Sequence, residues 1–252
     1  MGYTELKIEG RNPVIEAYRS GKTIDKLFVL DGCQDGPVKT ITREARKQHT
    51  IISYVSKERL DQLSETHHHQ GVIAIAAAYD YASVDDILAK AREKGEAPLI
   101  FLLDGIEDPH NLGAIVRSAY LCGAHGVVIP KRGGVGVTGT VMKASAGAAA
   151  RLPIARVSNL AQAIRTIKEH NIFVYCADLG GAPLAKTDLS GPVALVLGSE
   201  GGGPGALTRK LCDAAVTLEM APGQATGVDS YNVSVAAGIL CYDVMRRRLA
   251  KK

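Results

Sequence analysis

Cysteine is scarce in this sequence and shows no pairing pattern. The five cysteines are Cys33, Cys122, Cys176, Cys212 and Cys241. None of them belongs to a C-x-x-C pair, which argues against both a disulfide framework and a zinc ribbon. We therefore expect them to be ordinary small core residues.

Long apolar runs are also absent. No run approaches the length of a membrane span, and residues 1–12 lack the apolar core of a signal peptide. Hydrophobic residues make up 46% of the 252 residues and charged residues 22%, which is typical of a globular chain with one large or two ordinary domains. The sequence thus predicts a soluble cytoplasmic protein with no membrane partner.

Acidic residues are missing from one long stretch, residues 109–168. Its eight basic residues are Arg117, Lys131, Arg132, Lys143, Arg151, Arg156, Arg165 and Lys168. The formal net charge of the whole chain is only +4, so the asymmetry is local. Such a surface suits a polyanion, because each phosphate contact releases counterions. Some of the eight can instead lie on solvated helix faces, but a stretch this long without an acid favours nucleic-acid binding.

The first 79 residues alternate helical and extended segments. Helices are expected near 11–21, 38–48 and 57–63, the first with Asn12 as its N-cap and Pro13 at its first position. Strands are expected at 27–30, 51–55 and 72–77. These segments predict one small α/β domain, residues 1–79. Residues 80–97 are polar and acidic and predict a linker with a short helix.

Residues 98–252 predict a second, larger α/β domain. Strands are expected at 99–103, 127–129, 154–157, 172–177, 193–197 and 215–218, and helices at 112–122, 140–149, 160–170, 204–211 and 233–248. Alternation at this spacing indicates a mostly parallel sheet covered by helices. Ligands of such folds gather at the carboxyl ends of the strands. Glycine-rich and polar segments follow several of these strands, so we expect the functional site there.

The first such segment is DPHNLGAIVR, residues 108–117. It brings an amide, Asn111, and a guanidinium, Arg117, to a strand-to-helix junction, where catalytic groups tend to sit. The two residues are about 1.7 helical turns apart, so they project in different directions. The alternative is that Asn111 is a helix N-cap and Arg117 a solvated helix residue.

Two further segments follow later strands. Residues 198–203, GSEGGG, allow a backbone to approach a ligand closely, and Glu200 adds a carboxylate; the alternative is a flexible turn. Residues 228–238, VDSYNVSVAAG, offer Ser230 or Asn232 as a cap for the last helix, whose small residues allow tight packing. Three polar junctions in one sheet domain predict a single site.

Two familiar patterns are rejected. Residues 134–139, GVGVTG, satisfy the dinucleotide-binding expression, but the acidic ribose ligand expected further on is missing from the acid-free stretch. Residues 21–23, GKT, match the end of a P-loop, but Glu16 stands where its first glycine is required. Neither segment therefore predicts a nucleotide site.

The run His67-His68-His69 does not predict a metal site. Alternate residues of an extended chain point to opposite sides, so only His67 and His69 lie together, and we expect no carboxylate or cysteine partner beside them. An isolated site needs three or four ligands. We expect no metal, and a loop that leads into the strand at 72–77.

Taken in order, the three polar segments resemble the motifs of the SpoU-type (TrmH-like) branch of the SPOUT RNA methyltransferases. Residues 111–117 match N-L-G-x-x-x-R, residues 198–201 match G-S-E-G, and residues 230–238 match S-L-N-x-S-V-A-x-G with Tyr231 in place of leucine. The likeness includes KASAGAA at 143–149 and LPIARV at 152–157. GRNPV at 10–14 and HQGV at 69–72 resemble the substrate-binding domain of the 23S rRNA guanosine 2′-O-methyltransferases.

This resemblance implies a fold, a cofactor and an assembly. The N-terminal domain would be a small L30e-like α/β substrate-binding domain, and the C-terminal domain an α/β knot with a deep trefoil. The general rule against knotted chains means that no periodicity argument predicts the knot. The resemblance also implies S-adenosyl-L-methionine as the cofactor, no metal, and a homodimer around the last helix, which agrees with its small residues.

The resemblance also assigns residues to roles. The catalytic set it implies is Asn111, Arg117, Glu200, Ser230 and Asn232, and the cofactor contacts fall on Gly198, Leu218 and Tyr231. The expected RNA contacts are Arg11, Lys131, Arg132 and Lys143. The loop from Met220 to Ser230 is longer than the family pattern, which is the second departure beside Tyr231.

The implied reaction is methyl transfer to a ribose 2′-hydroxyl of RNA, with a guanosine of 23S rRNA as the expected target. A guanidinium stays charged in proteins, so we expect Arg117 to grip the adjacent phosphate and stabilise the developing alkoxide rather than to remove a proton. The alternatives are a tRNA or resistance-type rRNA 2′-O-methyltransferase, and a non-catalytic RNA-binding or ribosome-assembly factor on the same fold.

Overall fold

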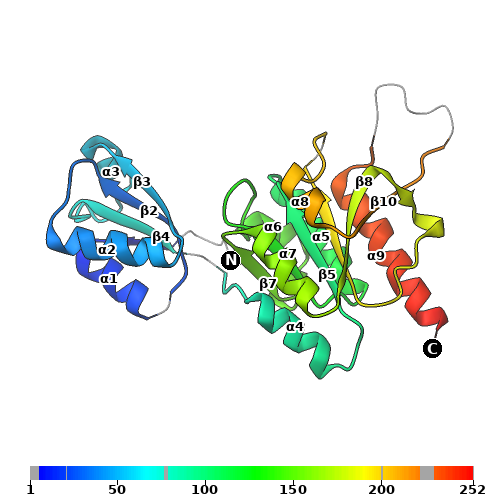
Figure 1. The fold of residues 1–252 in the computed structure, drawn as a ribbon. Helices are drawn as coiled ribbons and strands as arrows, with labels where there is room; N and C mark the ends of the chain where they lie inside the picture. Colours follow the sequence, from blue (N-terminus) through cyan, green and yellow to red (C-terminus); the bar gives the residue numbers. More distant parts are fainter. Residues whose placement is uncertain (1–5, 21, 77–78, 200, 222–229, 252) are drawn as a thin grey trace. The chain divides into compact units, whose positions relative to one another are not determined.

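The computed structural model describes residues 6–20, 22–76, 79–199, 201–221 and 230–251. The chain divides into two compact units, residues 1–80 and 81–252 (Figure 1). No helix among the described residues is long and apolar enough to cross a membrane.

The first unit is a four-stranded sheet with three helices. Its elements are β1 (Leu6–Glu9), α1 (Arg11–Arg19), β2 (Ile24–Leu30), α2 (Gly36–Lys47), β3 (Ile51–Val55), α3 (Lys57–Leu63) and β4 (Val72–Ala76). The strand order is β1-β4-β2-β3, in which β2 and β3 are parallel and β4 is antiparallel to both of its neighbours. The sequence did not predict β1, because its four residues show no clear pattern; pairing with the fully buried β4 makes it a strand.

The start of α1 corrects a sequence prediction. The N-cap is Gly10 and not Asn12, so the helix begins two residues earlier than the proline indicates. Gly10 has a φ of 90°, a region that favours glycine, and its N–H donates to the Val72 carbonyl at 3.2 Å. The sheet therefore decides where the helix starts.

The second unit is built on a six-stranded sheet. The strands are β5 (Leu99–Asp104), β6 (Gly126–Pro130), β7 (Ile154–Val157), β8 (Phe173–Pro183), β9 (Val193–Gly198) and β10 (Ala214–Thr217). Their order is β10-β8-β9-β5-β6-β7, and every neighbouring pair is parallel. This confirms the α/β class and the parallel sheet. The deep trefoil knot implied by the family resemblance stays a prediction.

The helices of this unit are α4 (Val84–Glu93), α5 (Pro109–Leu121), α6 (Gly139–Ala144), α7 (Leu160–Glu169), α8 (Ala206–Leu211) and α9 (Val233–Ala250). Short 3-10 turns lie at Ala148–Ala150 and Leu184–Lys186. The single helix predicted at 140–149 is therefore broken. The cause is local, since Ala146 and Gly147 both have positive φ, 50° and 84°.

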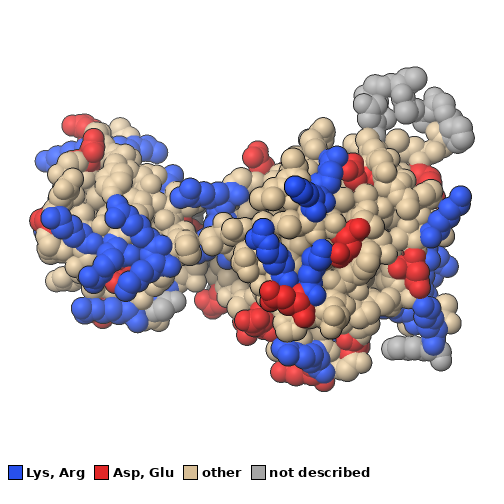
Figure 2. All heavy atoms as spheres, viewed as in Figure 1, with Lys and Arg blue, Asp and Glu red and all other residues tan. Residues whose placement is uncertain are grey.

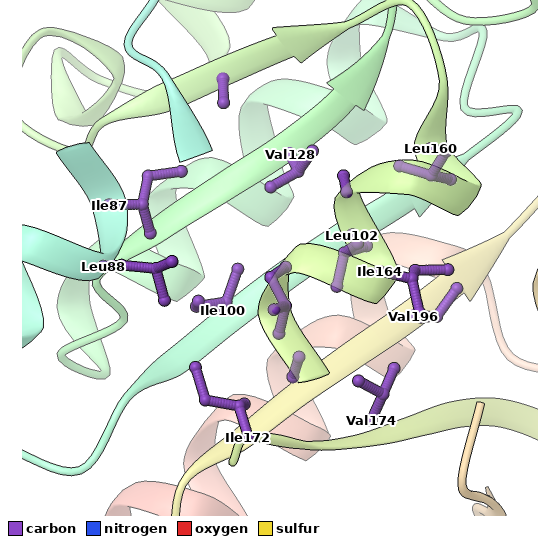
Figure 3. Close-up of a cluster of buried hydrophobic side chains, with 14 of the residues drawn as sticks. Ile87, Leu88, Ile100, Leu102, Val128, Leu160, Ile164, Ile172, Val174 and Val196 are labelled. Carbon is purple, nitrogen blue, oxygen red and sulfur yellow. The ribbon is translucent and has the colours of Figure 1, made fainter. Parts of the chain in front are cut away.

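Alternation along β5 distributes its side chains to two cores. Ile100 and Leu102 pack with α4 and α7 on one face of the sheet (Figure 3). Phe101 points to the other face, where α5 and α9 pack against each other, and it is fully buried. Burial on both faces explains why the strands of this sheet are continuous apolar runs.

The segment 80–97 contains the expected short helix, but it belongs mostly to the second unit instead of forming a separate linker. It lies mostly in the second unit and contains α4, whose N-cap Ser83 forms a capping box with Asp86. Ile87 is fully buried in the sheet core. A Cβ atom on Gly126 would lie 2.4 Å from the Ile87 side chain, so the helix rests directly on β6. The polar composition of this segment reflects one exposed helix face.

His125 provides a pH-dependent contribution to stability. The buried ring accepts a hydrogen bond from the Leu99 N–H at Nδ1 (3.1 Å), and Nε2 lies 3.1 Å from Glu96 Oε2. Burial lowers the pKa of His125 below the ordinary 6.5, although Glu96 acts in the opposite direction. The unfolded chain therefore takes up a proton first as the pH falls, and stability falls from about pH 6.5 down towards the folded pKa.

We expect the free energy of unfolding in urea to drop between pH 7.5 and pH 5.5, and His125→Gln to reduce this drop. Glutamine can accept from Leu99 and donate to Glu96 without titrating. His170→Gln, at the exposed end of α7, is the control and should leave the pH dependence unchanged. An identical pH dependence in wild type and His125→Gln would contradict the assignment.

Candidate active site

Two central strands end at the same level and set the position of the site. β5 and β9 pair over six residues, and the last pair joins Asp104 to Gly198. Asp104 Oδ2 accepts a hydrogen bond from the N–H of Gly205 at 2.9 Å, so the loop after β9 is tied to the end of β5. At the carboxyl edge of the sheet, a side chain at the end of β5 thus binds the backbone of the loop that follows β9.

Gly198 is required by a close approach of the chain to itself. A Cβ atom at this position would lie 1.8 Å from the carbonyl carbon of Gly203 and 2.0 Å from the nitrogen of Pro204. The loop returns over the strand end, where the Gly203 N–H donates to the Ser199 carbonyl at 2.9 Å. The glycine-rich segment therefore forms a tight turn against β9.

A cavity of about 400 Å3 lies beside this turn. It is lined by parts of β8, β9, the turn after β9, β10 and the start of α9. Four residues that the sequence assigned to the site line it, namely Gly198, Leu218, Ser230 and Tyr231. The hydroxyl of Tyr231 donates to the Glu219 carbonyl at 3.3 Å, so the residue that departs from the family motif joins the entry of α9 to the end of β10.

Asn111 and Asn232 meet at the start of two packed helices. The Asn232 Nδ2 donates to Asn111 Oδ1 at 3.1 Å. Asn232 is the N-cap of α9, and its Oδ1 accepts from the N–H of Ser234 at 2.9 Å. Asn111 is not a cap, because Asp108 caps α5 and accepts from the His110 N–H at 2.9 Å. The amide of Asn111 therefore forms a hydrogen bond between α5 and the N-cap of α9, and the first and third motifs are in direct contact.

Arg117 lies two turns into α5 with an exposed side chain. Within the described part of the chain, no hydrogen bond or ion pair engages its guanidinium, and it does not line the cavity. It is thus available to an external anion. Glu200, the remaining member of the predicted catalytic set, lies outside the described residues.

The predicted RNA contacts have different surroundings. Arg11 is engaged: its Nη2 lies 2.6 Å from Asp35 Oδ2, and its Nε donates to the Gln70 carbonyl at 3.1 Å. It therefore joins the start of α1 to the loops that precede α2 and β4. Arg132 and Lys143 are exposed, whereas Lys131 is half-buried.

The acid-free stretch does not act as one surface. Lys168 pairs with Asp213 at 2.7 Å, and the Arg156 guanidinium stacks over the Tyr81 ring at 5.4 Å from its centroid. Arg151 and Arg165 are exposed. Part of the basic excess therefore serves the fold, as the alternative of the sequence analysis allowed.

A basic surface on α2 was missed by the sequence analysis. Figure 2 shows Lys and Arg side chains gathered over α1 and α2 of the first unit. Exposed cations of α2 are Lys39, Arg43, Arg46 and Lys47, of which Arg43 and Lys47 contact Glu44. Their spacing on a helix was the available indication, but the balanced charge of residues 1–79 concealed it.

The histidine run has a carboxylate partner, Asp61, that the sequence analysis did not expect. His69 is nearly buried, its Nε2 lies 2.9 Å from Asp61 Oδ1, and its Nδ1 accepts from the Gly71 N–H. No group of three metal-binding side chains occurs among the described residues. His69 therefore holds the loop that precedes β4.

Two profiles of known families match the chain. The SpoU rRNA Methylase family matches residues 98–242, and the profile for RNA 2′-O ribose methyltransferase substrate binding matches residues 7–82. The fold and these matches define a two-domain protein of the RNA methyltransferase class. The chain belongs to the SpoU rRNA methylase family.

Similar proteins agree with this assignment. YacO of Bacillus subtilis (strain 168), whose name places it in the TrmH family of tRNA/rRNA methyltransferases, is 46% identical over 95% of this chain and 94% of its own length. A crystal structure named as an RNA 2′-O ribose methyltransferase is 28% identical and covers 97% of this chain and 89% of that one, with a TM-score of 0.54. The fold is also that of the SpoU methyltransferase AviRb from Streptomyces viridochromogenes, solved with AdoMet, with a TM-score of 0.61 at 23% identity over 98% and 91% of the two chains.

The close approach at Gly198 leads to a prediction. Gly198→Ala should displace the turn after β9 and weaken binding of S-adenosylhomocysteine by about 100-fold or more, because the clash is with backbone and cannot be relieved by a rotamer change. Gly191→Ala is the matched control, since nothing lies within 4 Å of its added Cβ. Calorimetric titration of both variants measures the effect, and equal affinities would refute it.

Proposed function

We propose that this chain transfers a methyl group from S-adenosyl-L-methionine to a ribose 2′-hydroxyl of RNA, with a guanosine of 23S rRNA as the target. The observation that carries the proposal is the meeting of all three motif segments at one edge of the parallel sheet, with Arg117 exposed nearby on α5. The profile match of the first unit and the substrate named for a 28% identical structure support the 2′-oxygen. An RNA substrate agrees with the cytoplasmic location expected from the sequence.

The cavity fits a nucleoside cofactor that is bound mainly by backbone. Gly198, Gly201 and Gly202 line the cavity with backbone that carries no side chain, and Leu218 and Val233 supply apolar walls. Such a mixture of apolar walls and a few polar groups is typical of cofactor sites. When bound, S-adenosylmethionine would supply an electrophilic methyl group. Gly198, Leu218 and Tyr231 would hold it, as the family resemblance implies.

Arg117 has the chemistry needed on the substrate side. A guanidinium presents a fork of donors that matches a phosphate, and it stays charged. Arg117 would hold the phosphate beside the target ribose and stabilise the oxygen as its proton leaves, while the phosphate takes that proton. Asn111, Asn232, Ser230 and Glu200 would orient the substrate and the motif loops. The hydrogen bond between the two asparagines keeps α5, and thus Arg117, in a fixed relation to α9.

The first unit favours a large structured RNA as substrate. Lys39 and Arg46 of α2 are exposed cations of the first unit, and the second unit separately exposes Arg132 and Lys143. Phosphate contacts of this kind position an RNA without reading its sequence. The profile match of the first unit and the sequence motifs at 10–14 and 69–72 favour 23S rRNA as the substrate. A tRNA, resistance-type rRNA methylation and a non-catalytic ribosome-assembly role are the alternatives.

We also propose a homodimer formed through α9. Val235, Ile239 and Tyr242 lie on one side of this helix and are 50%, 37% and 59% exposed. Leu121 of the neighbouring α5 is 68% exposed. Clustered exposed apolar residues on two packed helices are typical of an interface, and a two-fold axis would pair α9 with its own copy.

The test of the proposed reaction uses RNA from a strain that lacks the enzyme. Wild-type protein with methyl-labelled cofactor should label 23S rRNA at a single ribose 2′-oxygen, located by its resistance to alkaline cleavage. Arg117→Ala should lower the rate by about 1,000-fold and Arg117→Lys by less, while cofactor affinity stays near that of wild type.

Arg165→Ala is the matched control, because Arg165 is an exposed arginine of the same acid-free stretch on α7, which covers the other face of the sheet. Full activity of Arg117→Ala would refute the role of Arg117. Labelling of tRNA instead of 23S rRNA would refute the substrate, and cofactor binding without any labelling would favour the non-catalytic alternative.

The dimer is tested by light scattering after size exclusion. Ile239→Glu should convert a dimer into a monomer, because two carboxylates would be buried against each other at the axis. Leu207→Glu, a substitution at a similarly exposed leucine of α8, should leave the dimer intact. A monomeric wild-type protein at micromolar concentration would contradict the proposal.

A further inference from the structure

Among the described residues that line the cavity, two carry charge, Asp178 of β8 and Arg209 of α8. They form an ion pair, with Arg209 Nη1 2.9 Å from Asp178 Oδ2. The other described lining residues are apolar, glycine or hydroxyl-bearing, apart from the thioether of Met220. Neither charged residue belongs to the three motif segments, so the family pattern assigns no role to them.

A distortion of β8 brings Asp178 to the cavity. Cys176 pairs with Ala215 of β10, but the next residue of β10, Val216, pairs with Ala182. Residues 177–181 therefore bulge out of the ladder. A Cβ atom on Gly181 would lie 2.6 Å from the β10 backbone, so the base of the bulge is packed tightly. Bulges often redirect a side chain towards a functional site.

The Asp178 carboxylate is held in place through one of its two oxygens. Its side chain is 18% exposed, and Oδ2 is occupied by Arg209. Within the described part of the chain, no group donates a hydrogen bond to Oδ1. A carboxylate accepts about four hydrogen bonds and donates none, so this orientation presents an unused acceptor at the cavity.

We propose that Asp178 recognises the ribose diol of the bound cofactor, with Oδ1 accepting from the ribose hydroxyls and Arg209 acting as a positioning residue. The inference rests on the proposed function. A cis-diol offers two O–H donors, and a carboxylate is the group that holds ribose hydroxyls in dinucleotide sites.

The order of the strands indicates that Asp178 lies near the nucleoside end of the cofactor and not near the methyl group that is transferred. β8 and β5 lie on opposite sides of β9. Arg117 and Asn111 follow β5 on α5, so the transferred methyl group has to face that side. Asp178, on the β8 side, is therefore placed for the ribose.

The test is calorimetric titration with S-adenosylhomocysteine and with its 2′-deoxy and 3′-deoxy analogues. Wild type should bind a deoxy analogue about tenfold more weakly than the ribose form. Asp178→Ala should bind the ribose form about tenfold more weakly than wild type and lose this discrimination, while Asp178→Asn, which keeps one acceptor oxygen, should fall between them. Arg209→Gln should reduce the discrimination in part.

Asp213→Asn is the control, because it disrupts a neighbouring ion pair, with Lys168, outside the cavity; its discrimination should equal that of wild type. Equal weakening of ribose and deoxy ligands by Asp178→Ala would overturn the inference. The inference would also be overturned if Asp178→Ala weakened the binding of S-adenosylhomocysteine but not that of 5′-methylthioadenosine. The latter has the ribose but not the amino acid, so Asp178 would then act on the amino-acid part. Failure of wild type to bind any of these nucleosides would refute the proposed function itself, and the inference with it.

Discussion

The site depends on the parallel pairing of β5 with β9. This pairing brings Asp104 and Gly198 to the same level at the carboxyl edge of the sheet. Asp104 then holds the N–H of Gly205, and the absence of a side chain at Gly198 lets the intervening turn close over the strand end. Each of these contacts involves a backbone group, so the course of the chain at the strand ends directly shapes this side of the cavity.

Packing of α5 on α9 joins the cofactor side of the site to the substrate side. α9 starts at the cavity, since Ser230 and Tyr231 line it, and Asn232 both caps this helix and bonds to Asn111. α5 carries Arg117 at its exposed surface. Any shift of α9 relative to the sheet would therefore move Arg117 relative to the cavity. The same pair of helices also exposes the apolar residues proposed for the dimer, so assembly and catalysis would share one structural element.

Secondary structure in this chain was largely readable from local pattern. The strands at 51–55 and 154–157 and the helix at 57–63 have the predicted limits, because apolar periodicity and capping residues coincide there. The predicted limits of helices and strands were wrong where contacts with a neighbouring element, or the local backbone conformation, determine where an element begins or ends. Pairing with β4 creates β1 and moves the start of α1 to Gly10, and positive φ angles at Ala146 and Gly147 end α6 early.

The sequence alone determined the alternation of strands and helices, the three motif segments and the family that they resemble, because each of these is written in adjacent residues. Tertiary structure alone decided which side chains meet. It joins Asn111 to Asn232, engages Arg11 with Asp35, and brings Asp178 and Arg209 to one cavity. These pairs are separated by many residues along the chain, and only strand order, helix packing and the bulge of β8 bring them within hydrogen-bonding distance.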